Sequence, residues 1–147
     1  MYSKKVMQHF QEPHNVGEIE EASATAEAGN PICGDMMRFY LKVEDNRIVD
    51  IKFKTFGCAA AIASSSMLTD LVKGKTLEEA FSTTKNMIVD KLGGLPPNKV
   101  HCSILGVDAL RHAICNYWKK QGELDKHPQC KKLFDEYERQ SKEPEGH

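Results

Sequence analysis

Two stretches of alternating side chains constrain the fold of this chain more than any other feature of its sequence. Apolar residues occupy every second position of residues 37–43 and again of residues 49–53. A period of two is typical of β-strands that turn one face toward a core. A polar segment, residues 44–47, separates the two stretches. We therefore predict a β-hairpin with one face buried against the core.

Helices are predicted for most of the rest of the chain. In the longest one, which should begin near residues 101–103, apolar residues recur at spacings of three and four. Further helices are expected over residues 1–10, 59–73 and 84–92, at the capping box Thr76-Leu77-Glu78-Glu79, and from Pro128 onward. Residues 18–28 leave two alternatives, a loop or an edge strand. This order predicts the α+β class, a small antiparallel β-sheet packed on one face by several α-helices.

Length and charge limit what the chain can do. Its 147 residues suit one domain, expected over residues 1–122, followed by a C-terminal helical extension and frayed tail over residues 123–147. Twenty basic and 21 acidic residues give a net charge of −1, so nucleic acid is not an expected partner. The longest apolar runs fall well short of the ~20 residues that span a bilayer, and an export signal is not visible. We therefore expect a cytoplasmic protein that does not enter membranes.

Three of the five cysteines are expected in turns. Cys33 precedes the predicted hairpin, Cys58 follows it, and Cys102 opens the long helix. The dipoles of the two helices that begin near Cys58 and Cys102 favour the thiolate, the form that binds soft metals. Asp35 and His101 lie within two residues of these cysteines and add an oxygen and a nitrogen ligand.

Other interpretations of the cysteines and histidines remain open from the residues alone. A lone cysteine is often a small core residue, and the C-x-x-C spacing of ordinary zinc fingers is absent. An odd cysteine count without an export signal argues against a disulfide framework. We expect Cys115 to be a packing residue and Cys130 to have no role. The histidines other than His101 show no ligand spacing, and His112 is expected at the surface.

The segments around these cysteines resemble the scaffold proteins of iron–sulfur cluster assembly, the IscU/NifU N-terminal family. The similarity extends in order from residue 2 to about residue 120. The matching segments are Tyr2-Ser3-Lys4-Lys5-Val6-Met7-Gln8-His9-Phe10, Asn15-Val16-Gly17, Asn30-Pro31-Ile32-Cys33-Gly34-Asp35, Lys54-Thr55-Phe56-Gly57-Cys58, Ala61-Ile62-Ala63-Ser64-Ser65-Ser66 and Leu95-Pro96-Pro97-Asn98-Lys99-Val100-His101-Cys102-Ser103.

The resemblance implies a scaffold and carrier, not an enzyme. It implies a metal and cluster site made of Cys33, Asp35, Cys58, His101 and Cys102. A cysteine desulfurase would deliver sulfur, most plausibly to Cys102, and Fe²⁺ would bind in the same pocket. A labile [2Fe–2S] cluster would form there and pass to apo-proteins. Asp35 would make the cluster easier to release, because a carboxylate binds a soft cluster less firmly than a thiolate does.

Partners and alternatives follow from the same resemblance. Relatives dock an Hsp70-type chaperone through the segment that corresponds to Leu95, Pro96, Pro97, Asn98 and Lys99 of this chain. Asn98 replaces the usual valine here, so we expect poor recognition by such a chaperone. A homodimer could supply missing ligands. The alternative function is that of the SufU type, a zinc-dependent sulfurtransferase partner of a desulfurase. Those relatives carry an insertion between the second and third cysteine motifs, whereas here 43 residues separate Cys58 from Cys102. A structural Zn²⁺ ion held by the same ligands is a third interpretation.

Overall fold

The computed structural model describes residues 2–30 and 35–142 of the chain. Strands and helices follow one another in an order that keeps the three strands together near the start of the chain. The elements are α1 (Lys4–Gln11), β1 (Ala24–Asn30), β2 (Asp35–Glu44), β3 (Arg47–Phe56), α2 (Ala59–Val72), α3 (Leu77–Phe81), α4 (Lys85–Lys91), the 3₁₀ turn η1 (Pro97–Lys99), α5 (Val100–Lys120), the 3₁₀ turn η2 (Leu124–Lys126) and α6 (Pro128–Lys142).

The three strands form one antiparallel sheet in the order β1-β2-β3. The predicted hairpin is confirmed as β2 and β3, and the backbone φ angles of +51° at Asp45 and +62° at Asn46 match a tight two-residue turn. Residues 18–28, left open from the sequence, end in the edge strand β1. The prediction that Val49 faces the core is wrong, because the register shifts beside it. Ile48 is buried instead, and Val49 is 42% exposed.

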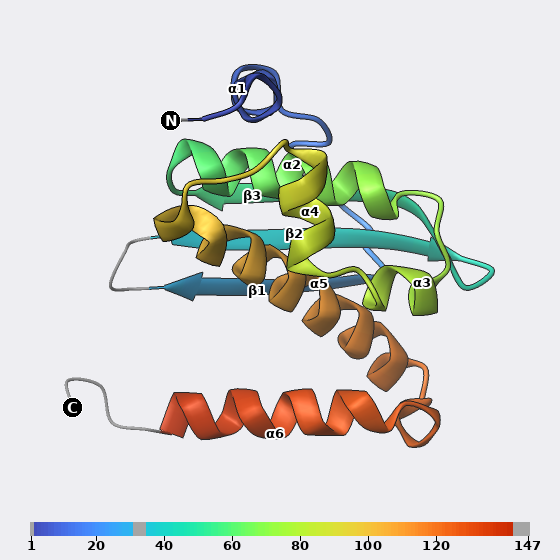
Figure 1. Cartoon of the computed structure of the whole chain (residues 1–147). Coiled ribbons are helices and arrows are strands. Elements are labelled where there is room, and N and C mark those ends of the chain that lie inside the picture. Colours follow the sequence, from blue (N-terminus) through green and yellow to red (C-terminus); the bar gives the residue numbers. More distant parts are fainter. Residues whose placement is uncertain (1, 31–34, 143–147) are drawn as a thin grey trace.

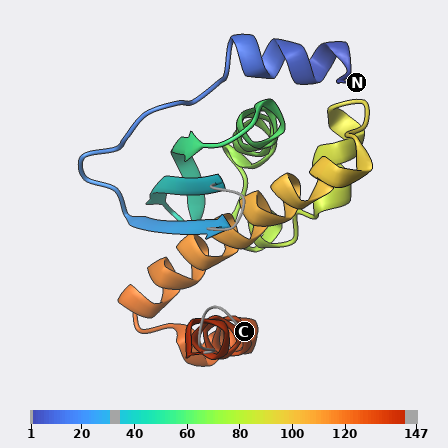
Figure 2. The ribbon, with the colours of Figure 1, turned by 90° about the vertical axis from the view of Figure 1, so that its left-hand side faces the viewer.

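Helices cover one face of this sheet, as predicted. Helix α5 runs along β1 and β2, α2 packs on β3 and α5, and α1 lies on the far side of α2 (Figure 1). Figure 2 shows the layers edge-on, with the segment between α1 and β1 passing around the sheet edge. The fold class is therefore confirmed. The core holds Trp118 of α5 and the sheet residues Phe39 and Phe53, all at most 1% exposed.

The predicted helices are present. Thr76 and Glu79 form the expected capping box of α3. In helix α1 the buried side chains are Val6 and His9, whereas Phe10 is 38% exposed. No helix among residues 2–30 and 35–142 is long and apolar enough to cross a membrane.

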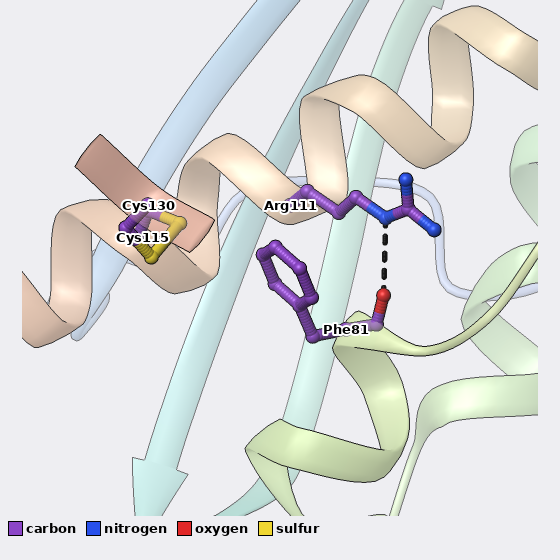
Figure 3. The surroundings of a disulfide bond; sticks show 4 residues. All are labelled: Phe81, Arg111, Cys115 and Cys130. Carbon is purple, nitrogen blue, oxygen red and sulfur yellow. Dashed lines mark hydrogen bonds between the residues drawn. A yellow bond between two sulfur atoms is a disulfide. The ribbon is translucent and has the colours of Figure 1, made fainter. Parts of the chain in front are cut away.

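The last helix, α6, is joined to α5 by a disulfide bond between Cys115 and Cys130 (Figure 3). Both cysteines are fully buried. The expectations that the cysteines form no disulfides and that Cys130 has no role are therefore wrong. Around the same junction, His112 is half-buried instead of lying at the surface, with its ring centroid 6.1 Å from that of Phe134. Predicting these contacts requires knowing that α6 folds back on α5.

Candidate metal and sulfur site

The ends of several strands and helices that carry predicted ligands meet at one end of the sheet. The end of β3, the start of α2 and the start of α5 lie there, beside the ends of β1 and β2 (Figure 1). Cys58 is the N-cap of α2, in extended conformation, and its carbonyl accepts the first helical hydrogen bonds from Ala61 and Ile62. Cys102 and His101 lie in the first turn of α5. The predicted placement of Cys58 and Cys102 at helix N-termini is confirmed.

The two thiols are separated by a distance that suits a shared metal ion. Cys58 Sγ lies 3.7 Å from Cys102 Sγ, and His101 Nε2 lies 3.7 Å from Cys102 Sγ. A tetrahedral ion with metal–sulfur bonds of about 2.3 Å holds two thiolates about 3.8 Å apart. With a metal–nitrogen bond of about 2.0 Å, the sulfur–nitrogen separation is about 3.5 Å. Cys58, Cys102 and His101 thus fit a soft or borderline metal with little rearrangement.

Of the two remaining predicted ligands, Asp35 and Cys33, the structure describes only the backbone of Asp35. Asp35 is the first residue of β2 and pairs with Asn30 of β1. The next residue of β2, Met36, pairs with Phe56, which lies two residues before Cys58. The backbone of Asp35 is therefore at the same end of the sheet as the thiols. Cys33 lies outside the described residues.

Burial differs among the cysteines of the site. Cys102 is fully buried and Cys58 is half-buried. Beside them, Phe56 is 75% exposed, and its strand partner Met36 is also exposed. Two exposed apolar side chains thus lie at the same end of the sheet as the thiols.

The segment that corresponds to the family's chaperone-docking motif, for which poor recognition is expected here, leads directly into α5. Residues 97–99 form η1, and the Lys99 N–H donates to the Pro96 carbonyl at 2.8 Å. Leu95 packs against the core, whereas Pro97 and Asn98 are exposed. Asn98, the position that departs from the usual motif, is therefore available at the surface.

A polar cluster that the sequence analysis missed joins α1 to α2. It contains His9 of α1, His14 of the following loop and Asp70 of α2. His14 Nδ1 lies 2.6 Å from an Asp70 carboxylate oxygen, and His9 Nδ1 lies 2.7 Å from Ser66 Oγ. The histidines and Asp70 are more than 50 residues apart, so local spacing in the sequence carries no signal for this contact.

Comparison with known proteins identifies the family. Residues 1–124 match the family described as "NifU-like N terminal domain". The chain belongs to this family. It is 60% identical over 126 residues to "Iron-sulfur cluster assembly scaffold protein IscU 1" of Archaeoglobus fulgidus, covering 86% of this chain and 82% of that protein.

A second relative spans more of the chain, and a solved structure shares its fold. The Aquifex aeolicus protein "Iron-sulfur cluster assembly scaffold protein IscU" is 46% identical over 146 residues, covering 98% of this chain and 93% of its own length. Among solved structures, a NifU-like protein (N-terminal) from Brucella abortus has a TM-score of 0.66 at 22% identity over 80% of this chain and 94% of that chain. It supports the NifU-like fold alone.

A second solved structure has a name that bears on the alternative function. A putative iron–sulfur cluster assembly scaffold protein for the SUF system of Fervidobacterium islandicum has a TM-score of 0.65 at 28% identity. The match covers 77% of this chain and 96% of that chain.

Proposed function

We propose that this chain is a scaffold on which iron–sulfur clusters are assembled and from which they are passed on. Its relatives at 60% and 46% identity carry this name over most of their length. In this chain itself, the proposal is supported by the 3.7 Å separation of the Cys58 and Cys102 sulfurs, which fits two thiolates on one metal. The protein is a carrier and not an enzyme.

The proposed ligand set is Cys33, Asp35, Cys58, His101 and Cys102. Its cargo is Fe²⁺ and sulfide, assembled as a [2Fe–2S] cluster. Four thiolates hold the clusters of storage ferredoxins firmly, whereas this set offers at most three thiolates with harder oxygen and nitrogen donors. A chain with too few thiolates is suited to releasing its cluster to an apo-protein. A second copy of the chain could complete the ligands in a homodimer.

Sulfur transfer is assigned to Cys102. Its thiolate would attack the outer sulfur of a persulfide on a cysteine desulfurase, so that a new S–S bond forms and the desulfurase thiolate leaves. Reducing that persulfide to sulfide then takes two electrons from a separate donor. Because Cys102 is fully buried, the desulfurase must first displace the residues that cover it. The exposed pair Phe56 and Met36 supports docking at this edge.

The zinc-dependent sulfurtransferase remains the alternative, and the SUF-system name of one similar structure favours testing it. Zinc suits the same sulfur and nitrogen ligands, so bound Zn²⁺ alone does not separate the two functions. The two functions differ in the fate of the sulfur. A scaffold retains it as sulfide with iron, whereas a sulfurtransferase passes it on as persulfide.

The assignment of Cys102 is tested by mass spectrometry after anaerobic incubation with a desulfurase and cysteine. Wild-type protein should gain one sulfur atom on Cys102. Cys102→Ser should lose this label, and Cys58→Ser, which changes the neighbouring thiol, should keep most of it. Label that remains in Cys102→Ser and disappears in Cys58→Ser would assign the acceptor to Cys58 instead.

A further inference from the structure

The His9, His14 and Asp70 cluster has the composition of a metal site. One ring nitrogen of each histidine and one Asp70 oxygen all lie within 4.8 Å of one another. The two ring centroids are 4.8 Å apart, with the planes tilted by 55°. We propose that these three residues bind a divalent first-row transition metal at a second site, separate from the cysteines.

The ligands are held in place by neighbouring groups, as in known metal sites. The Ser66 hydroxyl lies 2.7 Å from His9 Nδ1 and accepts the His14 backbone N–H at 2.9 Å. Asn15 Nδ2 donates to Asp70 Oδ1 at 3.2 Å and to Thr69 Oγ1 at 3.0 Å. Metal-binding histidines and carboxylates usually have such outer partners, which fix the orientation of the ring or carboxylate.

Accessibility allows an ion to enter and the ligands to close around it. His9 is buried, but the side chains of His14 and Asp70 are 54% and 37% exposed. Ligand atoms around a tetrahedral ion with bonds of about 2.0 Å lie about 3.3 Å apart. Because the ligand atoms lie up to 4.8 Å apart, the side chains must move to close around an ion, and the exposed side chains of His14 and Asp70 have room to do so. The ion takes the place of the direct contact between His14 and Asp70.

The ligand types define which metals fit. Two imidazoles and one carboxylate suit Zn²⁺, Co²⁺, Ni²⁺ or Fe²⁺, whereas Mg²⁺ and Ca²⁺ prefer oxygen ligands throughout. Three protein ligands on an open surface leave a position for water. The site also differs from the thiol site in having no sulfur, so the same ion gives a different visible spectrum in each of the two sites.

The two sites cannot share an ion. Cys58 is the N-cap of α2, and Asp70 lies near the other end of that helix. At a rise of 1.5 Å per residue, the separation of 12 positions in the chain corresponds to about 18 Å. The proposal is therefore independent of the cysteine chemistry, and its failure would leave the scaffold function untouched.

The test is equilibrium dialysis of the metal-free full-length chain against Co²⁺, read by metal content and by the visible spectrum. Thiolate-bound Co²⁺ gives a sulfur-to-metal charge-transfer band, which a nitrogen and oxygen site lacks. His14→Ala and Asp70→Asn should each bind one equivalent less than wild type, or bind it at least about tenfold more weakly. Their charge-transfer band should be unchanged. Cys58→Ser should show the reverse pattern, with a weaker band and the additional equivalent retained.

Asp90→Asn is the matched control, because Asp90 is an exposed aspartate on another helix, α4. It should bind as wild type does. The His14 side chain is mostly exposed and its hydrogen-bonded backbone N–H remains after substitution, so His14→Ala should fold. Thermal unfolding without metal checks this. The proposal would be overturned if His14→Ala and Asp70→Asn both took up as much Co²⁺ as wild type. The cluster would then serve only to hold α1 against α2 through hydrogen bonds.

Discussion

At the scale of single residues, Asp35 and the thiols set how firmly the proposed cluster is held and how readily it is released. The strand register places the backbone of Asp35 at the same end of the sheet as Cys58, although sequence alone could not fix that proximity. If its carboxylate weakens the ligand set, Asp35→Ala should retain a reconstituted cluster several-fold longer in air and pass it more slowly to an apo-ferredoxin. The decay of the visible cluster spectrum measures this. Equal decay in the variant and wild type would contradict the role of Asp35.

His9 gives a second prediction at the scale of a single residue. Burial lowers the pKa of His9 below its usual 6.5, and the charges of His14 and Lys5 act in the same direction, while Asp70 opposes them. The unfolded chain therefore binds a proton more readily than the folded one. The stability that the neutral His9 side chain contributes is present above about pH 6.5. It is lost as the pH falls from there through the lower pKa of His9 in the folded state.

The contribution of His9 is measured as the fall in melting temperature between about pH 7.5 and about pH 5.5. His9→Asn lowers stability at all pH values by removing the contact with Ser66, but it should show a smaller fall over this range than wild type. An equal fall in both proteins would show that His9 does not contribute to the acid sensitivity.

At the scale of elements, the disulfide determines how firmly α6 is held on α5. A bond that closes a loop of about 15 residues stabilises a protein by about 3 kcal/mol, and Cys115 and Cys130 are 15 positions apart. Cys130→Ala should lower the free energy of unfolding by about that amount. The stacking of Trp118 on His127, with ring centroids 3.5 Å apart, places a fluorescent reporter at this junction.

Chemical denaturation followed by Trp118 fluorescence therefore measures the effect of Cys130→Ala. Gln129→Ala is the control, because Gln129 is exposed and adjacent to Cys130. A reducing agent should lower the stability of wild type and leave Cys130→Ala unchanged. Wild-type protein that is insensitive to reduction would show that the disulfide does not hold α6. The division of the chain into a domain of residues 1–122 and an extension of residues 123–147 stays a prediction.

The elements also show which features can be predicted from sequence. The hairpin and the capped helices were predictable because their signals are local: alternation, a polar turn, and the box of Thr76 and Glu79. The exposure of Val49 was not, because one extra residue in β3 changes which side chains face the core. The Cys115–Cys130 bond was missed because its partners meet only after the chain reverses at Gly122.

At the scale of the whole molecule, we expect the core to hold together without a metal. Buried side chains from the sheet and from α1 to α6 form one cluster, of which the thiol site touches only one end. Small domains that need zinc to fold lack such a core. Treatment with a chelator should therefore leave the far-UV circular dichroism and a cooperative melting transition in place. Unfolding on metal removal would favour the structural zinc interpretation.

The central claim is that the chain builds and releases a cluster. The most direct measurement is the iron and acid-labile sulfide content, with the visible spectrum, after anaerobic incubation with a cysteine desulfurase, cysteine, a reductant and Fe²⁺. We predict iron and sulfide in equal amounts, with charge-transfer bands that disappear as an apo-ferredoxin acquires its cluster. Retained zinc, no labile sulfide and a faster desulfurase would contradict the claim and indicate the sulfurtransferase.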